Sequence, residues 1–490
     1  MDFLDPSKKR SHTIRLFVGY ILVAIAIAIG ALILLFQSYG YGVDRKTGQV
    51  IQNGLVFLSA HPDSAAIYIN GTQNSARTDA KLSLPAGRYA VELKRDGYRN
   101  WKHELNLDGG SVEQLVYPVL FPEKLVTSDV QLYGSSPAFA TASPDHHWLL
   151  VLQPGSLVKF DNFDLNNVNQ TPTTVTVPDG LLTSATGDQA LSLAEWSTDN
   201  RHIMLKHTYN GTYEYIMVDR ENPGLSFNVN KLVGSTPAEV SLRDKRYDQL
   251  YIYDSAAQTL QTYDVKAKQQ TPLLTKVLKY KTHGADTVLY VSSDSGGKAG
   301  KLGVRMFDGK NNYLVNTYSD TTSFLLDLAQ FSGDWYIVVG LQQEGRVTIY
   351  KNPQDTLKQQ NHGIPTALLL RIDNPQFVSF SDNARFIAAQ SGSKFAVYDA
   401  ETDRRFYYQL KNDVPVSQQA VWMDGHRLLL VLNGKTEVFD FDGTNQQTLS
   451  ASNPGFIPYF DRDYTSMYNI APSVQVSGRS ALTRTELKVK

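Results

Sequence analysis

The sequence predicts an all-β protein attached to a membrane by one N-terminal helix. Three observations support this fold class: an apolar run near the N-terminus, alternating apolar and polar residues after it, and markers of strand ends that repeat toward the C-terminus. Aromatic residues make up 11% of the 490 residues, with 27 Tyr and 21 Phe, a composition typical of strands. A chain of this length can form about three domains.

The composition excludes several kinds of site. The chain has no cysteine, which excludes disulfides, cysteine-ligated zinc, iron–sulfur clusters and a thiol nucleophile. Lys and Arg total 47 against 48 for Asp and Glu, so the basic excess that nucleic-acid binding requires is missing. We therefore expect no nucleic-acid partner.

Residues 16–36 form an uncharged run, LFVGYILVAIAIAIGALILLF. As a helix this run would span roughly 31 Å, the thickness of the hydrocarbon core of a bilayer. The alternatives are a buried helix of a soluble domain and a cleaved signal peptide. The residues that follow, Gln37-Ser38-Tyr39-Gly40-Tyr41, lack a small-residue cleavage pattern, which favours an uncleaved transmembrane helix.

Basic residues flank this run unequally. The ones before it are Lys8, Lys9, Arg10 and Arg15, and the ones soon after it are Arg45 and Lys46. The positive-inside rule then predicts a cytoplasmic tail at residues 1–15 and an extracytoplasmic segment at residues 37–490. We expect a single-pass protein of the cell membrane, bound to the lipid bilayer through residues 16–36, with a linker at residues 37–53.

Residues 54–121 have the pattern of a small β-domain. Period-2 alternation and turn residues predict strands at 55–58, 66–69, 88–93, 101–107 and 112–120. Asn70-Gly71 lies between two of these runs and is typical of a type I′ hairpin turn, because both residues tolerate positive φ.

Short motifs in this segment resemble the PEGA domain, a small β-fold of bacterial and archaeal envelope proteins. The matching pieces are Ser59-Ala60-His61-Pro62, residues 65–71, residues 84–91 and Gly97-Tyr98-Arg99-Asn100-Trp101. The signature string itself reads Leu84-Pro85-Ala86-Gly87 here. The resemblance implies an envelope-associated adhesive or scaffolding module without catalytic residues.

From residue 124 onward a marker recurs in which a strand ends in an aromatic or aliphatic residue followed by Asp. These markers are Phe160-Asp161, Val218-Asp219, Tyr263-Asp264, Phe307-Asp308, Tyr398-Asp399 and Phe439-Asp440, with Tyr350-Lys351 in the one gap. Most intervals are in the low-to-middle forties, the length of a four-stranded propeller blade. A pair of stacked β-sandwiches is the alternative that this regular period disfavours.

A second marker is a turn placed before an apolar strand. It reads Ser143-Pro144-Asp145, Trp196-Ser197-Thr198-Asp199, Phe380-Ser381-Asp382-Asn383 and Trp422-Met423-Asp424-Gly425. These turns resemble those of WD40-like and TolB-type β-propellers, which implies a C-terminal propeller over residues 124–490. We expect eight blades, with residues 125–132 supplying the strand that the last one lacks; seven blades is the alternative.

Few residues have the pattern of a chemical site. Asp145-His146-His147 could contribute metal ligands, and Asp440-Phe441-Asp442-Gly443 and Asp461-Arg462-Asp463 faintly resemble calcium loops. Asn70-Gly71-Thr72 and Asn210-Gly211-Thr212 match the glycosylation pattern. All five segments also suit ordinary turns. We therefore predict no catalytic, metal-binding or cofactor-binding residue and no cofactor.

These features together predict a bacterial, membrane-anchored binding or scaffold protein and not an enzyme. It would recognise an envelope polymer or an envelope protein through the surfaces of the PEGA-like domain and the propeller. A purely structural role in an envelope assembly is a further alternative. Another is an exported enzyme, such as a hydrolase, with its site in the propeller channel; Asp145, His146 and Glu195 would be its first candidates.

Overall fold

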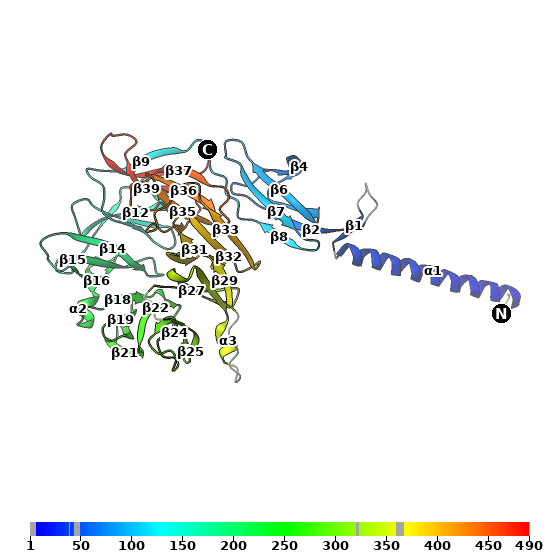
Figure 1. Ribbon diagram of the computed structural model, residues 1–490. Helices are drawn as coiled ribbons and strands as arrows, with labels where there is room; N and C mark the ends of the chain where they lie inside the picture. Colours follow the sequence, from blue (N-terminus) through cyan, green and yellow to red (C-terminus); the bar gives the residue numbers. More distant parts are fainter. Residues whose placement is uncertain (1–5, 39, 44–49, 320–322, 359–366, 490) are drawn as a thin grey trace, which may run out of the picture. The chain divides into compact units, whose positions relative to one another are not determined.

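The computed structural model describes residues 6–38, 40–43, 50–319, 323–358 and 367–489. The chain divides into two compact units (Figure 1). The first comprises Met1–Lys124 with Val489–Lys490, and the second comprises Leu125–Lys488.

Helix α1 (Pro6–Ser38) contains the apolar run. Its segment His12–Phe36 is long and apolar enough to cross a membrane, and none of this segment is buried against the rest of the protein. A helix whose apolar side chains all lie outside the protein core has the properties of a membrane-spanning segment or a signal sequence.

The β-domain of the first unit contains two four-stranded sheets among its described residues. One sheet consists of β1 (Tyr41–Val43), β2 (Val50–Leu58), β5 (Ala80–Pro85) and β8 (Val112–Leu115). The other consists of β4 (Thr72–Arg77), β3 (Ala66–Ile69), β6 (Gly87–Lys94) and β7 (Trp101–Leu107). Strand β2 pairs antiparallel with β5 and parallel with β8. The last strand of the domain, β8, therefore lies beside its first long strand, β2.

Burial in this domain follows the period of two expected for strands. Leu93 on β6 lies opposite Trp101 on β7, and both are buried in the core. The predicted turn at Asn70-Gly71 is confirmed, with both residues at positive φ. It leads into β4, however, and the sequence patterns miss both β4, which is almost entirely polar, and β5.

The described part of the second unit contains eight four-stranded antiparallel sheets. We number them sheet 1 to sheet 8. Sheet 1 contains β10 (Ala140–Ala142), β11 (Trp148–Leu152), β12 (Lys159–Asp164) and β13 (Thr173–Thr176). Sheet 2 contains β14 (Gln189–Trp196), β15 (His202–Tyr209), β16 (Thr212–Asp219) and β17 (Phe227–Asn228). Sheet 3 contains β18 (Glu239–Leu242), β19 (Gln249–Asp254), β20 (Thr259–Asp264) and β21 (Gln269–Leu274).

Sheet 4 contains β22 (Val277–His283), β23 (Thr287–Ser292), β24 (Lys301–Asp308) and β25 (Asn312–Ser319). Sheet 5 contains β26 (Phe324–Phe331), β27 (Asp334–Leu341), β28 (Arg346–Lys351) and β29 (Ala367–Arg371). Sheet 6 contains β30 (Phe377–Phe380), β31 (Phe386–Ser391), β32 (Lys394–Asp399) and β33 (Arg404–Gln409).

Sheet 7 contains β34 (Val421–Trp422), β35 (Arg427–Leu432), β36 (Lys435–Asp440) and β37 (Gln447–Ala451). Sheet 8 contains β38 (Tyr459–Phe460), β39 (Ser466–Pro472), β40 (Ser480–Glu486) and β9 (Val126–Tyr133). Short helical segments occur in the connections: α2 (Val229–Val233), α3 (Pro353–Leu357), η1 (Leu165–Asn167), η2 (Pro223–Leu225), η3 (Arg243–Lys245) and η4 (Gln342–Glu344).

Sheet 8 joins the two ends of the second unit. Strand β9 pairs antiparallel with β40, and Thr127 and Thr485 are register partners whose Oγ1 atoms lie 3.0 Å apart. The prediction that residues 125–132 complete the last sheet is therefore confirmed. Such closure leaves the C-terminal strand with a partner and covers an edge that would otherwise be exposed.

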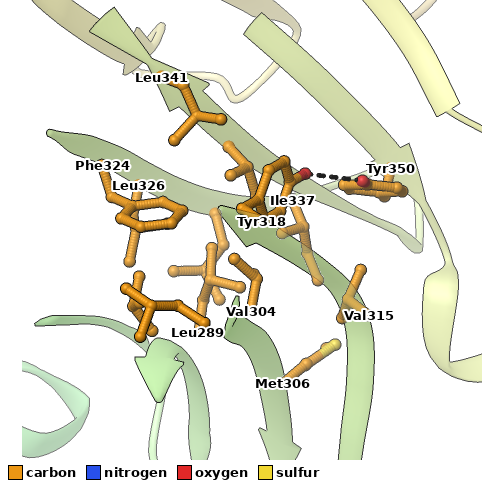
Figure 2. Packing of buried hydrophobic residues seen from close by; sticks show 14 residues of the cluster. Leu289, Val304, Met306, Val315, Tyr318, Phe324, Leu326, Ile337, Leu341 and Tyr350 are labelled. Carbon is orange, nitrogen blue, oxygen red and sulfur yellow. Dashed lines mark hydrogen bonds between the residues drawn. The ribbon is translucent and has the colours of Figure 1, made fainter. Parts of the chain in front are cut away.

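The hydrophobic core of the propeller lies between neighbouring sheets. Figure 2 shows one such layer, in which Leu289, Val304 and Met306 of sheet 4 pack toward Phe324 and Ile337 of sheet 5. At its edge the buried Tyr318 and Tyr350 hydroxyls share a hydrogen bond of 2.9 Å. First strands of neighbouring sheets also lie side by side, as β22 and β26 do, so the first strands form the inner wall of the propeller.

Candidate functional site

The recurring Asp residues at the ends of third strands act as turn formers. Asp219 accepts two hydrogen bonds from the Arg201 guanidinium, at 2.7 and 2.6 Å, and one each from the backbone N–H groups of Glu221 and Asn222. Burial acts to raise the pKa of Asp219, but the hydrogen bonds from Arg201 and Asn222 outweigh it and lower the pKa. A carboxylate used in this way stabilises the turn.

One strand-end marker was placed wrongly from the sequence. Phe160-Asp161 lies inside β12, which continues to Phe163-Asp164. Asp164 makes the capping contact, since its side chain accepts a hydrogen bond from the backbone N–H of Asn166 at 2.9 Å. Phe160-Asp161 and Phe163-Asp164 have the same aromatic–Asp pattern, and only the strand pairing in the structure shows which of them ends the strand.

The turns between the first and second strands have a shared internal geometry. The third turn residue caps the backbone that follows: Asp145 Oδ1 accepts from the N–H of His147, Asp199 Oδ1 from those of Arg201 and His202, and Asn383 Oδ1 from that of Arg385. The residue after the cap is in the left-handed region, as in His146, Asn200 and Ala384. The second sequence marker is therefore also a turn signal.

These turns contact one another from sheet to sheet. We call this set the turn belt; it surrounds one end of the inner wall, because each turn directly follows a first strand. The Asp145 N–H donates to Asn200 Oδ1 at 3.3 Å, and the Thr198 N–H donates to the Lys245 carbonyl at 2.9 Å. On the other side of sheet 1, His146 Nδ1 lies 3.1 Å from the Phe460 carbonyl in sheet 8.

The three residues Asp145-His146-His147 do not point to a shared site. Ser143 Oγ and the His147 N–H donate to Asp145, His146 contacts the Phe460 carbonyl, and His147 Nε2 lies 3.1 Å from Asp164 Oδ1. Among the described residues, no group of three or more His, Asp or Glu is arranged to hold a metal ion.

The other acidic motifs are also turns. Asp461 accepts hydrogen bonds from the N–H of Thr465 at 2.7 Å, from its hydroxyl and from the N–H of Ser466. Asp442 accepts from the N–H and the hydroxyl of Thr444. Asn210-Gly211 forms the tip between β15 and β16, with both residues at positive φ, as Asn70-Gly71 does between β3 and β4.

Charged side chains line the inner wall on sheets 2 to 5. They are Glu195 on β14, Glu239 on β18, Lys279 and Lys281 on β22, and Asp327 on β26. Glu239 and Lys279 are exposed to water, yet burial raises the pKa of Glu239 and lowers that of Lys279. The surrounding protein atoms thus disfavour the charged forms of both side chains although water still reaches them.

Several of these wall residues hold neighbouring sheets together. Glu195 Oε2 accepts a hydrogen bond from the Leu242 N–H of sheet 3 at 2.6 Å, and its Oε1 pairs with Lys245. Asp327 Oδ2 accepts from the Phe380 N–H of sheet 6 at 3.3 Å, and Lys279 Nζ donates to the Phe324 carbonyl of sheet 5 at 2.7 Å. Glu195, a candidate of the enzyme hypothesis, is thus occupied by structural contacts.

A second group of polar residues lies in the turn belt, on sheets 6, 7, 8 and 1. We call His146, Asp382, Asp424 and Tyr464 the Asp382 cluster. The rings of His146 and Tyr464 are 5.6 Å apart, and the Tyr464 hydroxyl donates to the Met423 carbonyl at 3.1 Å. Burial raises the pKa of Asp382, the charge of Asp424 raises it further, and His146 acts in the opposite direction.

The sequence patterns identified the Asp382 turn but assigned it no role, and they missed Tyr464. The sequence held a signal at Asp382, which precedes the capping residue of its turn and so is not needed for the cap. The structure shows in addition that Tyr464 is in the left-handed region, which bulky residues rarely adopt.

A cavity of about 490 Å³ lies between sheets 2 and 3. The His202 imidazole forms part of its lining, stacked on the Tyr247 ring at 3.6 Å, with Nδ1 2.6 Å from Asp199 Oδ2. The buried carboxylate in the lining, Asp219, is paired with Arg201. The polar groups that line the cavity therefore have most of their hydrogen-bond and ion-pair partners within the protein.

Residues 53–118 match the PEGA domain family. This segment is a PEGA domain. The match extends from the middle of β2 to beyond β8 and so includes strands of both sheets of the first unit, but not β1. In this domain the Glu92 carboxylate pairs with Lys94 at 3.0 Å and with Lys102 at 3.3 Å.

Similar solved structures are β-propellers. They include the Dos1 propeller (11% identity, 74% of this chain and 96% of that chain, TM-score 0.44). Others are lmo1340 of Listeria monocytogenes EGD-e (12%, 66% and 91%, TM-score 0.38) and Hsv2 of Kluyveromyces lactis (12%, 69% and 91%, TM-score 0.32). No curated protein gave a match. At these identities the likeness concerns the fold and carries nothing about ligands.

Proposed function

We propose that this protein is a membrane-anchored binding or scaffold protein that recognises a component of the cell envelope, either a polymer or another protein. The observation that carries the proposal is the order of parts: an apolar helix outside any core, then a PEGA domain, then a propeller. A membrane anchor confines the binding surfaces to the envelope, and confinement raises the effective concentration of a weak contact.

The same proposal includes the absence of enzymatic activity. Asp219, Asp399 and Glu195 are tied into ion pairs or backbone hydrogen bonds that stabilise turns and sheets. Catalytic carboxylates need access to a substrate, whereas these contribute to the fold. The enzyme alternative keeps one supporting observation, the imidazole of His146 and the phenol of Tyr464, whose rings are 5.6 Å apart in the turn belt.

We further propose that α1 is retained as an anchor, with residues 1–15 in the cytoplasm and residues 37–490 outside. The excess of basic residues before the span supports this orientation. Protease added to intact cells that have a single bounding membrane should degrade the propeller. Complete protection of the propeller from the protease would contradict this orientation and indicate the opposite one.

Co-sedimentation with isolated cell wall tests the binding function. Full-length protein in a mild detergent should sediment with washed wall in a saturable way, and the PEGA domain alone, residues 50–122, would then show which part binds the polymer. If the wall binds neither, crosslinking in intact cells should capture a single membrane or envelope protein. A protein that neither sediments nor crosslinks would contradict the proposed function.

A further inference from the structure

A second cavity, of about 290 Å³, lies where the two ends of the propeller chain meet. Its lining comes from strand β9, from strand β40 and from the connection between β12 and β13 of sheet 1. Polar side chains in this lining include Ser128, Asp129, Asn169, Gln170, Thr171 and Arg484. The volume is at the lower end of the roughly 300–1,000 Å³ typical of ligand sites, so the cavity suits a molecule of about one ring.

One side of this cavity is apolar. Phe163 and Val168 in the lining belong to the buried hydrophobic layer between sheets 1 and 8, and Val130 packs against that layer. Val130 has no register partner in β40, which makes it the extra residue of a β-bulge. The bulge interrupts the alternation of faces along β9, and the four consecutive residues 128–131 all line the cavity.

The positive charge in the lining is that of Arg484. Its Nε donates to Ser466 Oγ at 3.0 Å. Its two Nη groups make no hydrogen bond or ion pair with any other residue that the structure describes. A guanidinium whose Nη groups are both uncommitted presents a planar fork that matches the two oxygens of a carboxylate.

The negative charge in the lining is that of Asp129. Its carboxylate accepts hydrogen bonds from the Ser473 hydroxyl and from the backbone N–H groups of Val474 and Gln475. These donors hold Asp129 in place, and its charge repels a second anion more strongly the more charge that anion carries. A singly charged carboxylate therefore fits beside Arg484 better than a phosphate dianion does.

Neutral polar side chains surround the charged pair. Asn169, Gln170 and Thr171 are exposed residues of the connection between β12 and β13, and Ser128 lies on β9. Their side chains make no hydrogen bond to another residue in the described part of the chain. Amide and hydroxyl groups both donate and accept hydrogen bonds, as sugar hydroxyls do. Together with the apolar side, they suit a ring that has hydroxyls at its edge and C–H groups on its face.

We propose that this cavity binds a sugar that carries a carboxylate, either within an acidic polysaccharide or as a free uronic acid. Arg484 pairs with the carboxylate through its two Nη groups, and Asn169, Gln170 and Thr171 hydrogen-bond with the ring hydroxyls. This inference rests on the proposed function, because it names the chemical class of envelope polymer that the propeller binds.

Calorimetric titration of the full-length protein, in a detergent without a sugar headgroup, tests the site. The probes are glucuronate, galacturonate and a galacturonate trimer. Galactose lacks the carboxylate, acetate lacks the hydroxyls, and inorganic phosphate is a different anion. At least one uronate should bind, and the three controls should bind at least tenfold more weakly. Failure of all uronates to bind, or an equal affinity for acetate or phosphate, overturns the proposal.

The same titration identifies the source of the sugar. Tighter binding of the trimer than of galacturonate supports the proposal with a polysaccharide as the ligand. Equal or tighter binding of the single sugar supports it with a free sugar acid as the ligand.

Variants separate the site from the fold. Arg484→Gln should weaken uronate binding by about tenfold or more, the loss expected for one charge-assisted contact. Asn169→Ala and Gln170→Ala change exposed side chains of a connection, so they should weaken binding severalfold and leave the urea midpoint unchanged. Arg371→Gln, at an exposed arginine on β29, is the matched control and should bind as the wild-type protein does.

Wild-type affinity of a folded Arg484→Gln variant would overturn the inference. If Arg484→Gln does not fold, the two connection variants decide, and wild-type affinity in both of them overturns it. The proposed function fails separately, through loss of wall sedimentation and crosslinking in the wild-type protein. A protein that sediments with cell wall but binds no uronate keeps its proposed function and loses this site.

Discussion

The indole Nε1 of Trp196 in sheet 2 donates a 2.8 Å hydrogen bond to the hydroxyl of Thr141, which lies on the first strand of sheet 1. The same relationship recurs between sheets 7 and 6, where Trp422 Nε1 donates to Ser379 Oγ at 3.0 Å. In each case a Trp at the end of a first strand bonds to the first strand of the preceding sheet. These hydrogen bonds between neighbouring sheets explain why two of the turn markers in the sequence contain Trp.

Replacing these indoles should destabilise the propeller. Trp196→Ala should cost about 3–5 kcal/mol of unfolding free energy, because it removes a large buried side chain, and Trp422→Ala should cost less because Trp422 is only partly buried. Urea denaturation measures both. A double-mutant cycle of Trp196→Phe with Thr141→Val measures the free energy of the hydrogen bond. A coupling free energy of zero would show that lost packing alone accounts for the destabilisation by Trp196→Ala.

The closing pair of strands can be tested with a disulfide, since the chain has no cysteine of its own. Thr127→Cys with Thr485→Cys places two thiols at register partners whose side chains already touch. Oxidation should form the bond and stabilise the protein by up to about 4–5 kcal/mol, the chain-entropy estimate for a very long loop. Non-reducing electrophoresis and urea denaturation measure this. The pair Thr127→Cys with Ser473→Cys, whose residues are not register partners, should not crosslink.

Glu214 and His207 form a buried hydrogen-bonded pair in sheet 2, with Nδ1 and Oε1 2.9 Å apart. Burial acts to raise the pKa of Glu214, but hydrogen bonds from the Thr183 N–H, His207 and Asn228 outweigh it and lower the pKa. Glu214 therefore adds stability that is complete above its unfolded pKa of roughly 4.3 and is lost as the pH falls through its lower folded value.

Glu214→Gln should cost about 3–5 kcal/mol near neutral pH, because it leaves the partner His207 buried without its carboxylate. Urea denaturation at pH 7 and at pH 3 measures the effect, and the difference from wild type should shrink at the lower pH. Asp413→Asn is the control for a surface carboxylate. A constant difference across this pH range would mean that the amide disrupts packing and that no charge effect is involved.

Deleting residues 1–36 should produce a soluble protein that retains both units, because none of His12–Phe36 is buried against the rest of the protein. Fractionation after a high-salt wash, followed by circular dichroism of the soluble fraction, measures this. The full-length protein under the same wash is the control and should stay with the membrane. Membrane association of the shortened protein would indicate a second attachment.

Much of the architecture could be predicted from local patterns. The periodic Asp residues, the Asn-Gly tips and the turns before second strands are signals that act over a few residues, and the structure confirms the strands beside them. Strands β4 and β5 were not predicted in this way; in the structure they pair with β3 and β2, respectively. The choice between Phe160-Asp161 and Phe163-Asp164 likewise required the register of sheet 1.

The apolar helix, the β-class of the rest and the spacing of the propeller repeats follow from the amino-acid sequence alone, since hydrophobic period and turn chemistry are properties of neighbouring residues. Which polar residues meet depends on the tertiary structure. His146 and Tyr464 are distant in the chain and belong to two sheets, and their rings come together because each turn follows an inner strand. Closure of the propeller brings sheet 8 next to sheet 1, and that proximity has no signature in any local stretch of sequence.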